Sequence, residues 1–207
     1  MKRKILPVAM AVVMTVVCLA GCSGNFTKAS FINAAKKCGM EKLDENMSLN
    51  EIMLNEEESH AVYYVEKDQD RMNLLITQYA PVAEVKEFVQ AVETIGKSDD
   101  NKNCLTNVYY LTAVDSENAK EIYESLIITY DNPENGEKDG VTYTICYFGP
   151  EDSPNANDQF TGEIAYGVYL KGNKIIWIRS YFDSTLENNC VEDFCKSLGL
   201  VSPYTLK

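Results

Sequence analysis

The chain contains one histidine, His60, and this single imidazole limits the catalytic chemistry that the sequence supports. His60 closely follows three glutamates at 56–58, so a neighbouring carboxylate would orient it as the base of a secreted hydrolase. The alternative is a partly exposed histidine at a strand edge, because no partner stands at a fixed spacing from it. The sequence also lacks G-x-S-x-G, H-E-x-x-H, Walker and dinucleotide-binding motifs. We therefore predict a protein that is not an enzyme and takes no cofactor, with a hydrolase that uses His60 as the alternative.

Acidic residues could bind calcium in two segments, but neither has the required ligand pattern. Residues 41–58 hold seven carboxylates and one lysine without the regular spacing of a calcium loop. Residues 131–136 start like an EF-hand loop, yet Pro133 and Thr142 occupy the third and twelfth positions, where an oxygen ligand and a glutamate are required. The sequence therefore predicts no metal site, and a solvated polar loop over 131–140.

Two strands rich in aromatic and β-branched residues, 163–170 and 174–182, are joined by a turn that contains a Gly-Asn dipeptide. A two-residue connection of this type is typical of a β-hairpin. The resulting register places Tyr166 opposite Arg179. Gly167 lies on the other face of the hairpin, where its lack of a side chain would let a helix approach closely.

The chain has thirteen tyrosines beside one tryptophan, and several of the tyrosines fall in predicted strands. Because side chains alternate across a strand, four residues would share one side of the hairpin: Tyr166, Trp177, Arg179 and Tyr181. Aromatic rings combined with hydroxyl and guanidinium groups are typical of surfaces that contact proteins or sugars. The alternative is structural, since tyrosine has a high strand propensity and packs well under helices. We predict a binding patch at these four residues, with an envelope protein or a glycan as its partner.

Acidic residues outnumber basic ones, and this balance excludes one class of partner. The chain has 19 lysines and arginines against 31 aspartates and glutamates, which gives a formal charge of -12. Such a protein repels a phosphate backbone, so we predict that it binds no nucleic acid. A composition that is 45% hydrophobic and 24% charged is typical of a folded domain and not of a disordered or multi-span membrane protein.

The amino terminus has the layout of an export signal. Residues 1–4 are basic after the initial methionine, and residues 5–20 are apolar. The apolar stretch ends in the tetrapeptide Leu19-Ala20-Gly21-Cys22. This order of segments resembles the lipobox signal of bacterial lipoproteins. The resemblance implies that residues 1–21 are removed and that the cysteine is diacylated, for example with palmitate, at the new amino terminus.

The same resemblance implies a lipid-anchored protein on the extracytoplasmic face of the cell membrane. Two acyl chains anchor a protein stably, whereas one chain holds it only marginally. Residues 22–28 would form the lipidated Cys22 and a short tether, and residues 29–207 a globular domain. Three basic residues leave with the signal, so the formal charge falls from -12 to -15, and the domain would stand off an anionic lipid surface. In composition and layout the domain is similar in general style to small lipoproteins of Gram-positive bacteria.

Five cysteines remain in this domain: Cys38, Cys104, Cys146, Cys190 and Cys195. The number is odd, so at least one stays unpaired within the chain, and none belongs to a C-x-x-C motif. A domain of this size buries enough core to fold without disulfides. We predict buried cysteines that act as small apolar residues, with at most one bridge, and the sequence leaves any pairing open.

The first and last helices of the predicted domain have matching sequences. Residues 31–40 and 191–200 align without a gap, each with apolar residues at i, i+3, i+4 and i+7. Each segment ends in a glycine, Gly39 or Gly199, followed by an apolar residue, which is typical of a Schellman helix end.

Two predicted strand–helix units follow one another between these helices. Residues 72–79 have the pattern of a strand and 82–92 that of a helix; residues 108–114 and 118–128 repeat this order, with Ser116 as the helix N-cap. The repetition suggests an internal half-repeat. The sequence therefore predicts a single α+β domain with a mostly antiparallel sheet and helices packed on one face.

Overall fold

The computed structural model describes residues 26–44, 59–95, 104–128, 130, 132–149, 162–182 and 190–207. The predicted signal peptide and Cys22 lie outside these residues. The strands are β1 (Glu41–Lys42), β2 (His60–Glu66), β3 (Val85–Ile95), β4 (Cys104–Ala113), β5 (Glu134–Lys138), β6 (Val141–Phe148), β7 (Glu163–Lys171) and β8 (Lys174–Phe182). The helices are α2 (Lys28–Lys37), α4 (Gln69–Thr77), α5 (Ser116–Ile127), α6 (Cys190–Leu198) and the short 3₁₀ helix η1 (Pro203–Leu206).

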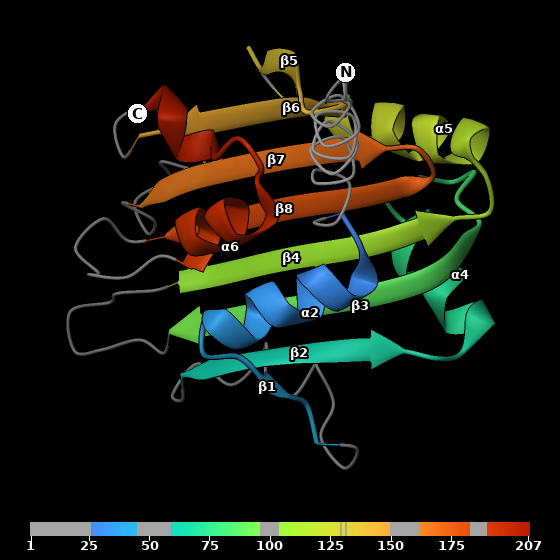
Figure 1. The fold of residues 1–207 in the computed structure, drawn as a ribbon, viewed down its shortest axis with the longest axis horizontal. Helices are drawn as coiled ribbons and strands as arrows, with labels where there is room; N and C mark the ends of the chain where they lie inside the picture. Colours follow the sequence, from blue (N-terminus) through green and yellow to red (C-terminus); the bar gives the residue numbers. More distant parts are fainter. Residues whose placement is uncertain are drawn as a thin grey trace, which may run out of the picture.

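The eight strands form one sheet in the order β1-β2-β3-β4-β8-β7-β6-β5 (Figure 1). All neighbours pair antiparallel except β1 and β2, which are parallel. The pairing of β4 with β8 at the centre joins the amino-terminal and carboxy-terminal halves of the sheet. The prediction of an α+β fold built on a mostly antiparallel sheet is confirmed.

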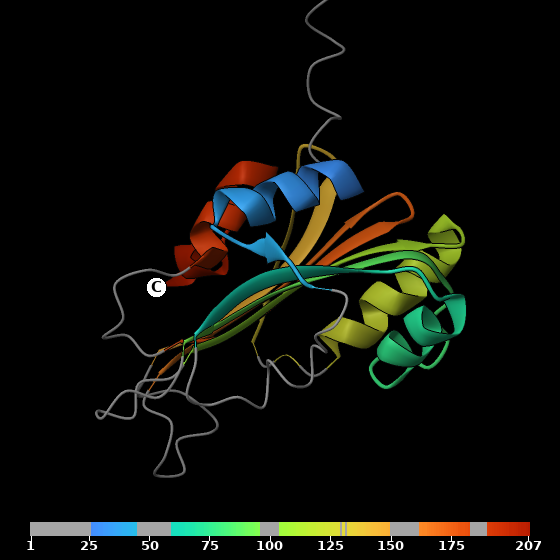
Figure 2. The ribbon, with the colours of Figure 1, turned by 90° about the horizontal axis from the view of Figure 1, so that it is seen from below.

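Helices cover both faces of the sheet, so the prediction that they pack on one face is wrong. Figure 2 shows α2 and α6 on one side of the sheet and α4 and α5 on the other. The reason lies in the central strands, which are apolar on both sides. In β4, Val108 and Tyr110 belong to the core under α2 and α6, whereas Tyr109 and Leu111 belong to the core under α4 and α5. A strand that is apolar on both sides needs cover on both to exclude water.

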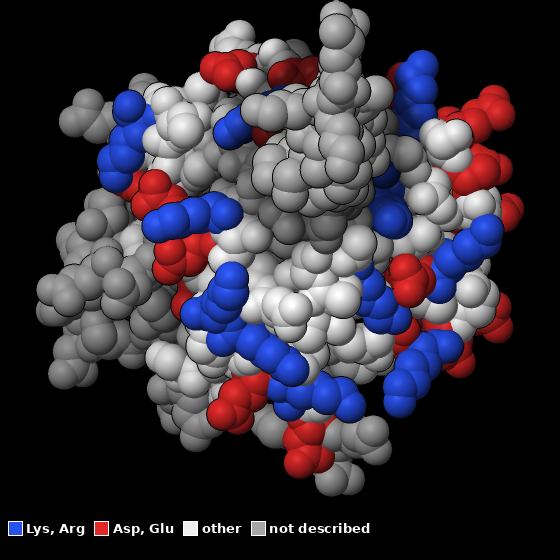
Figure 3. Space-filling model, in the orientation of Figure 1, with Lys and Arg blue, Asp and Glu red and all other residues white. Residues whose placement is uncertain are grey.

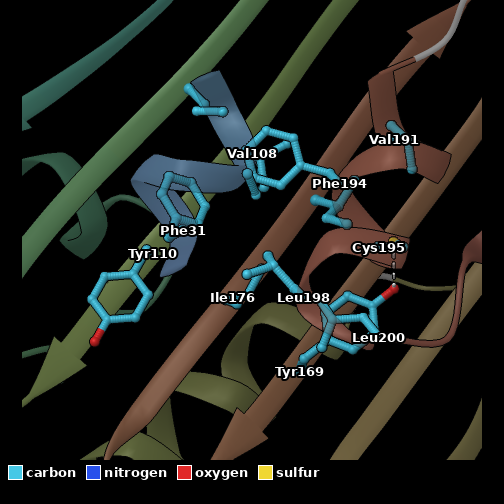
Figure 4. Packing of buried hydrophobic residues seen from close by; sticks show 14 of the residues in the cluster. Phe31, Val108, Tyr110, Tyr169, Ile176, Val191, Phe194, Cys195, Leu198 and Leu200 are labelled. Atoms are coloured by element: carbon cyan, nitrogen blue, oxygen red, sulfur yellow. Dashed lines mark hydrogen bonds between the residues drawn. The ribbon is translucent and has the colours of Figure 1, made fainter. Parts of the chain in front are cut away.

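The matched helices α2 and α6 pack beside each other on one face, and both end as the sequence predicts. Gly39 and Gly199 have φ of 79° and 71°, and the residue after each donates its N–H to a carbonyl five residues earlier, at 3.0 Å and 2.9 Å. These are the bonds of a Schellman end, which needs the left-handed conformation that glycine adopts without strain. The rings of Phe31 and Phe194 meet between the helices, with centroids 5.2 Å apart (Figure 4).

The segment before β4 differs from the prediction. Residues 72–79, predicted as a strand, lie largely in α4, and most of residues 82–92, predicted as a helix, lie in β3. The Asp68 carboxylate accepts the N–H of Arg71 at 3.0 Å and starts α4. The valines of β3 suggested a helix because β3, paired on both sides, is buried on both faces and loses the two-residue period of a half-exposed strand. The chain therefore runs α4–β3 and then β4–α5, so the predicted repeat of two strand–helix units is absent.

Helix α5 lies close to its predicted position, whereas one predicted loop contains a strand. Helix α5 forms as expected, although its N-cap is Asp115, whose carboxylate accepts the N–H of Asn118 at 2.8 Å, and not Ser116. The loop predicted over 131–140 contains the polar edge strand β5.

The predicted β7–β8 hairpin forms in the expected register, with Tyr166 opposite Arg179. Gly167 does not admit a helix, because the space beside its Cα is filled by the ring of Tyr169 from the same strand. In Figure 4 this ring lies between the strands and α6, near Cys195. The hairpin occupies the middle of the sheet, so its aromatic residues meet side chains from distant segments.

Candidate functional site

Three of the four predicted patch residues line one pocket of about 420 Å³ on the face that carries α4 and α5. Tyr166, Trp177 and Arg179 form its floor from strands β7 and β8. The rest of the wall comes from the ends of other elements: Gln78, Tyr79, Ser125, Leu126, Ile128, Tyr130 and Phe148. We call this the Arg179 pocket. Its volume lies within the range of roughly 300–1,000 Å³ that is typical of small-ligand sites.

Trp177 is held in place by aromatic and polar contacts. Its ring stacks on Tyr109 at a centroid distance of 4.8 Å, with an interplanar angle of 25°. Tyr79 meets it edge-on, also at 4.8 Å. The indole Nε1 donates a hydrogen bond to the hydroxyl of Tyr130 at 3.0 Å. The indole is therefore fixed before any ligand arrives.

A second aromatic group lies beside it. The rings of Tyr130 and Tyr166 stack at 5.2 Å with an interplanar angle of 14°. The hydroxyl of Tyr166 pairs with that of Tyr181 at 2.6 Å. Tyr181, the fourth predicted patch residue, therefore contacts a residue of the pocket wall but does not line the pocket itself. Burial raises the pKa of both Tyr130 and Tyr166, so both phenols are neutral near pH 7.

Arg179 is the charged residue of the pocket. Its Nη1 donates to the hydroxyl of Tyr79 at 3.1 Å, and its Cζ lies 5.3 Å and 5.2 Å from the ring centroids of Tyr79 and Trp177. Both distances suit a cation–π contact. Burial lowers the pKa of Arg179, but the neighbouring tyrosines raise it by more, so the net pKa lies above its ordinary value. The guanidinium keeps its charge.

No carboxylate balances this charge among the described residues. The ion pairs found there involve other cations, namely Lys28, Arg71, Lys120 and Lys207. None of the described residues that line the pocket is an aspartate or a glutamate. On the opposite face, which carries α2 and α6, basic and acidic side chains are interspersed (Figure 3). The Arg179 pocket is thus a small positive site in an acidic protein.

The structure does not bring His60 to this pocket. His60 opens β2, which β3 and β4 separate from β8, and its backbone N–H donates to Oγ1 of Thr94 at 3.2 Å. Within the described segments no group of histidine, cysteine and acidic side chains is arranged to hold a metal ion.

The five cysteines of the domain are free thiols in the structure, and all but Cys38 are buried. Burial raises the pKa of Cys104 and Cys195 to about 12, so these thiols are protonated at neutral pH. Cys195 packs against the phenol of Tyr169, with its Sγ 3.9 Å from the hydroxyl oxygen. These contacts agree with the predicted packing role.

Sequence reasoning did not find Tyr79, Tyr130 and Phe148, which complete the pocket. Tyr79 fell at the end of a predicted strand, whereas it follows α4 in the structure. Tyr130 follows α5, and Phe148 ends β6. The sequence shows only that these aromatic residues lie at or near the ends of helices and strands. It does not show that the ends of these elements lie close together in the fold.

No protein-family model and no curated protein matches this chain. None of the helices in the described segments is long and apolar enough to cross a membrane.

Proposed function

We propose that this chain is a lipid-anchored, extracytoplasmic binding protein without catalytic activity, and that the Arg179 pocket is its binding site. The observation that carries the proposal is the set of fixed aromatic rings around a guanidinium that has no carboxylate partner among the described residues. Rigid aromatic walls lower the entropic cost of binding, and a small number of polar groups fixes a ligand's orientation.

The chemistry of the pocket favours binding over catalysis. Its ionisable groups are Arg179 and tyrosines, and burial keeps Tyr130 and Tyr166 protonated near pH 7 by raising the pKa of each. A general base needs a pKa near the working pH, and an arginine stays protonated. A hydrolase that uses His60 has no support from the described geometry, because His60 lies outside the pocket.

The anchor is proposed from the lipobox resemblance at Cys22. The described chain starts at Phe26, just before α2, on the face of the sheet opposite to α4 and α5 (Figure 2). A short tether from Cys22 to α2 would hold that face toward the membrane. The Arg179 pocket would then open on the other face, toward soluble components of the envelope, either an envelope protein or a glycan or a small molecule.

The single tryptophan provides a direct test. Trp177 lines the pocket and is the only tryptophan of the chain, so its fluorescence reports on occupancy. Soluble envelope fractions, separated into peptides, glycans and small acids, would be titrated into the purified domain. We expect at least one fraction to change the emission of Trp177 in a saturable way.

Two matched variants decide whether this response comes from the pocket. Ser125→Phe adds a ring at the pocket wall, and Glu121→Phe adds the same ring one turn earlier on α5, outside the pocket. The response should disappear in Ser125→Phe and persist in Glu121→Phe. An equal response in both variants, or no response to any fraction, would count against the pocket as the binding site.

A further inference from the structure

We infer that the ligand of the Arg179 pocket carries one carboxylate, held by the guanidinium, on a flat apolar body that packs against the aromatic rings. This inference rests on the proposed function, because it specifies the ligand of the same pocket.

The polar side chains of the pocket other than Arg179 already have partners within the protein. The hydroxyls of Tyr130 and Tyr166 are bonded to Trp177 and Tyr181. Two further polar residues of the wall donate hydrogen bonds to backbone carbonyls of the adjacent helices. Gln78 Nε2 donates to the carbonyl of Leu75 at 3.0 Å, and Ser125 Oγ donates to the carbonyl of Glu121 at 2.9 Å. A ligand with many hydroxyl or amide groups would therefore leave most of them without partners, at a cost in free energy.

Arg179 is different, because a guanidinium has more N–H donors than its tyrosine partners accept. One bond goes to Tyr79, and a second contact is with the hydroxyl of Tyr181. The remaining N–H groups form part of a planar fork, which matches the two oxygens of a carboxylate. Among the described residues that line the pocket, Arg179 is thus the one charged group, and its unused N–H donors lie together at one point.

The charge of the site favours a carboxylate over a phosphate. Arg179 supplies one positive charge, whereas a phosphate monoester carries about -1.5 to -2 at neutral pH. The rest of the protein is acidic, with a formal charge of -12, and repels the excess negative charge of a phosphate. A monoanionic carboxylate is balanced by the single guanidinium.

The rest of the wall sets the shape of the ligand's body. Leu126, Ile128 and Phe148 are apolar, and Ile128 is 81% exposed. Exposed apolar surface beside a pocket is covered when an apolar ligand binds. The rings of Trp177 and Tyr166 offer flat faces, so a phenyl-sized group fits this surface.

The test compares acids with their neutral amides. The probes are 3-phenylpropionate and 3-phenylpropionamide, together with an acetylated tripeptide that ends in phenylalanine and has a free or an amidated carboxyl terminus. Binding is followed by the emission of Trp177. We expect at least one acid to bind about tenfold more tightly than its amide, which corresponds to about 1.4 kcal/mol. Preference for the small acid would identify a free carboxylic acid as the ligand type, and preference for the peptide acid a peptide carboxyl terminus.

Substitution of Arg179 completes the test. Arg179→Gln should bring the acid-to-amide ratio to about one, and Arg179→Lys, which keeps the charge but loses the fork, should leave an intermediate ratio. A far-UV circular dichroism spectrum and a melting temperature close to those of the wild type verify that Arg179→Gln is folded. Equal binding of acids and amides by the wild type, or a ratio that survives in Arg179→Gln, would overturn the inference while leaving the pocket as a binding site.

A failure of every probe to bind would also overturn the inference of a phenyl-sized carboxylate. The proposed function is judged separately, by the response of Ser125→Phe and Glu121→Phe to envelope fractions.

Discussion

Replacing Gly167 with alanine would place a methyl group where the ring of Tyr169 lies. A Cβ built on Gly167 comes within 2.6 Å of the Tyr169 hydroxyl oxygen and within 2.8 Å and 2.9 Å of two ring carbons. Tyr169 cannot swing away, because it is fully buried and its hydroxyl donates a hydrogen bond to the carbonyl of Val201 at 2.6 Å. The strain must therefore be taken up by the backbone or by the packing of the core.

Overpacking of a filled core costs roughly 1–3 kcal/mol. Because Tyr169 is held at both ring and hydroxyl, we expect Gly167→Ala to lose about 2–3 kcal/mol of unfolding free energy. For a domain of this size, that loss lowers the melting temperature by about 4–12 °C. Urea unfolding followed by the emission of Trp177 measures the free energy directly, as a lower midpoint with an unchanged m-value.

A matched control separates the steric effect from the change of residue type. Gly136 on the edge strand β5 lies opposite Tyr143, and a Cβ there would also contact the tyrosine ring. Tyr143 is only partly buried and can move toward solvent, so Gly136→Ala should cost less than about 1 kcal/mol.

A double-mutant cycle with Tyr169→Leu identifies the cause of the loss. If the ring is responsible, Gly167→Ala should cost at least about 1 kcal/mol less in the Tyr169→Leu background than in the wild type. A cost for Gly167→Ala below about 0.5 kcal/mol, or one that does not depend on Tyr169, would refute the reasoning.

Two further predictions concern an ionisable group and the anchor. Burial raises the pKa of Glu66, but hydrogen bonds from Tyr64 and the backbone, with the charge of Arg71, outweigh it and the net pKa is lowered. A carboxyl whose pKa is lowered by folding stabilises the fold at pH values above its ordinary pKa. This stabilisation is lost as the pH falls through the pKa of the folded state. Glu66→Gln should therefore have a lower unfolding free energy than the wild type at pH 7. Urea unfolding should show that this difference becomes smaller below about pH 4, and a difference that does not depend on pH would contradict the prediction. Cys22→Ser should abolish labelling by a radioactive fatty acid and leave the signal unprocessed, and unchanged labelling would disprove the anchor.

Several parts of the fold were predictable because they depend on neighbouring residues. The ends of α2 and α6 follow from Gly39 and Gly199, each followed by an apolar residue. The register of the β7–β8 hairpin follows from its Gly-Asn turn, which fixes the pairing of Tyr166 with Arg179.

The segment that forms α4 and β3 was not predictable in the same way. β3 is buried on both faces, so its apolar residues show no two-residue alternation, and Val85 and Val89 happen to share a helical spacing. In α4, the strand-like run of apolar residues from Met72 is overridden by the cap at Asp68 and by contact with the core.

The Arg179 pocket, too, was predictable only in part from the sequence. The sequence placed Tyr166, Trp177 and Arg179 on one side of a hairpin, because side chains alternate along strands. It did not show that this side becomes a pocket, nor that Tyr79 and Tyr130 complete it.

The sequence by itself determined the helix ends, the hairpin register and the grouping of aromatic residues around Arg179, since each of these is set by residues close together in the chain. The tertiary structure decided that helices cover both faces (Figure 2) and that residues at the ends of α4 and α5 line one pocket together with the hairpin. The physical reason is the pairing of β4 with β8, which joins segments about 70 residues apart and is set by burial of both faces of the sheet and not by any local signal.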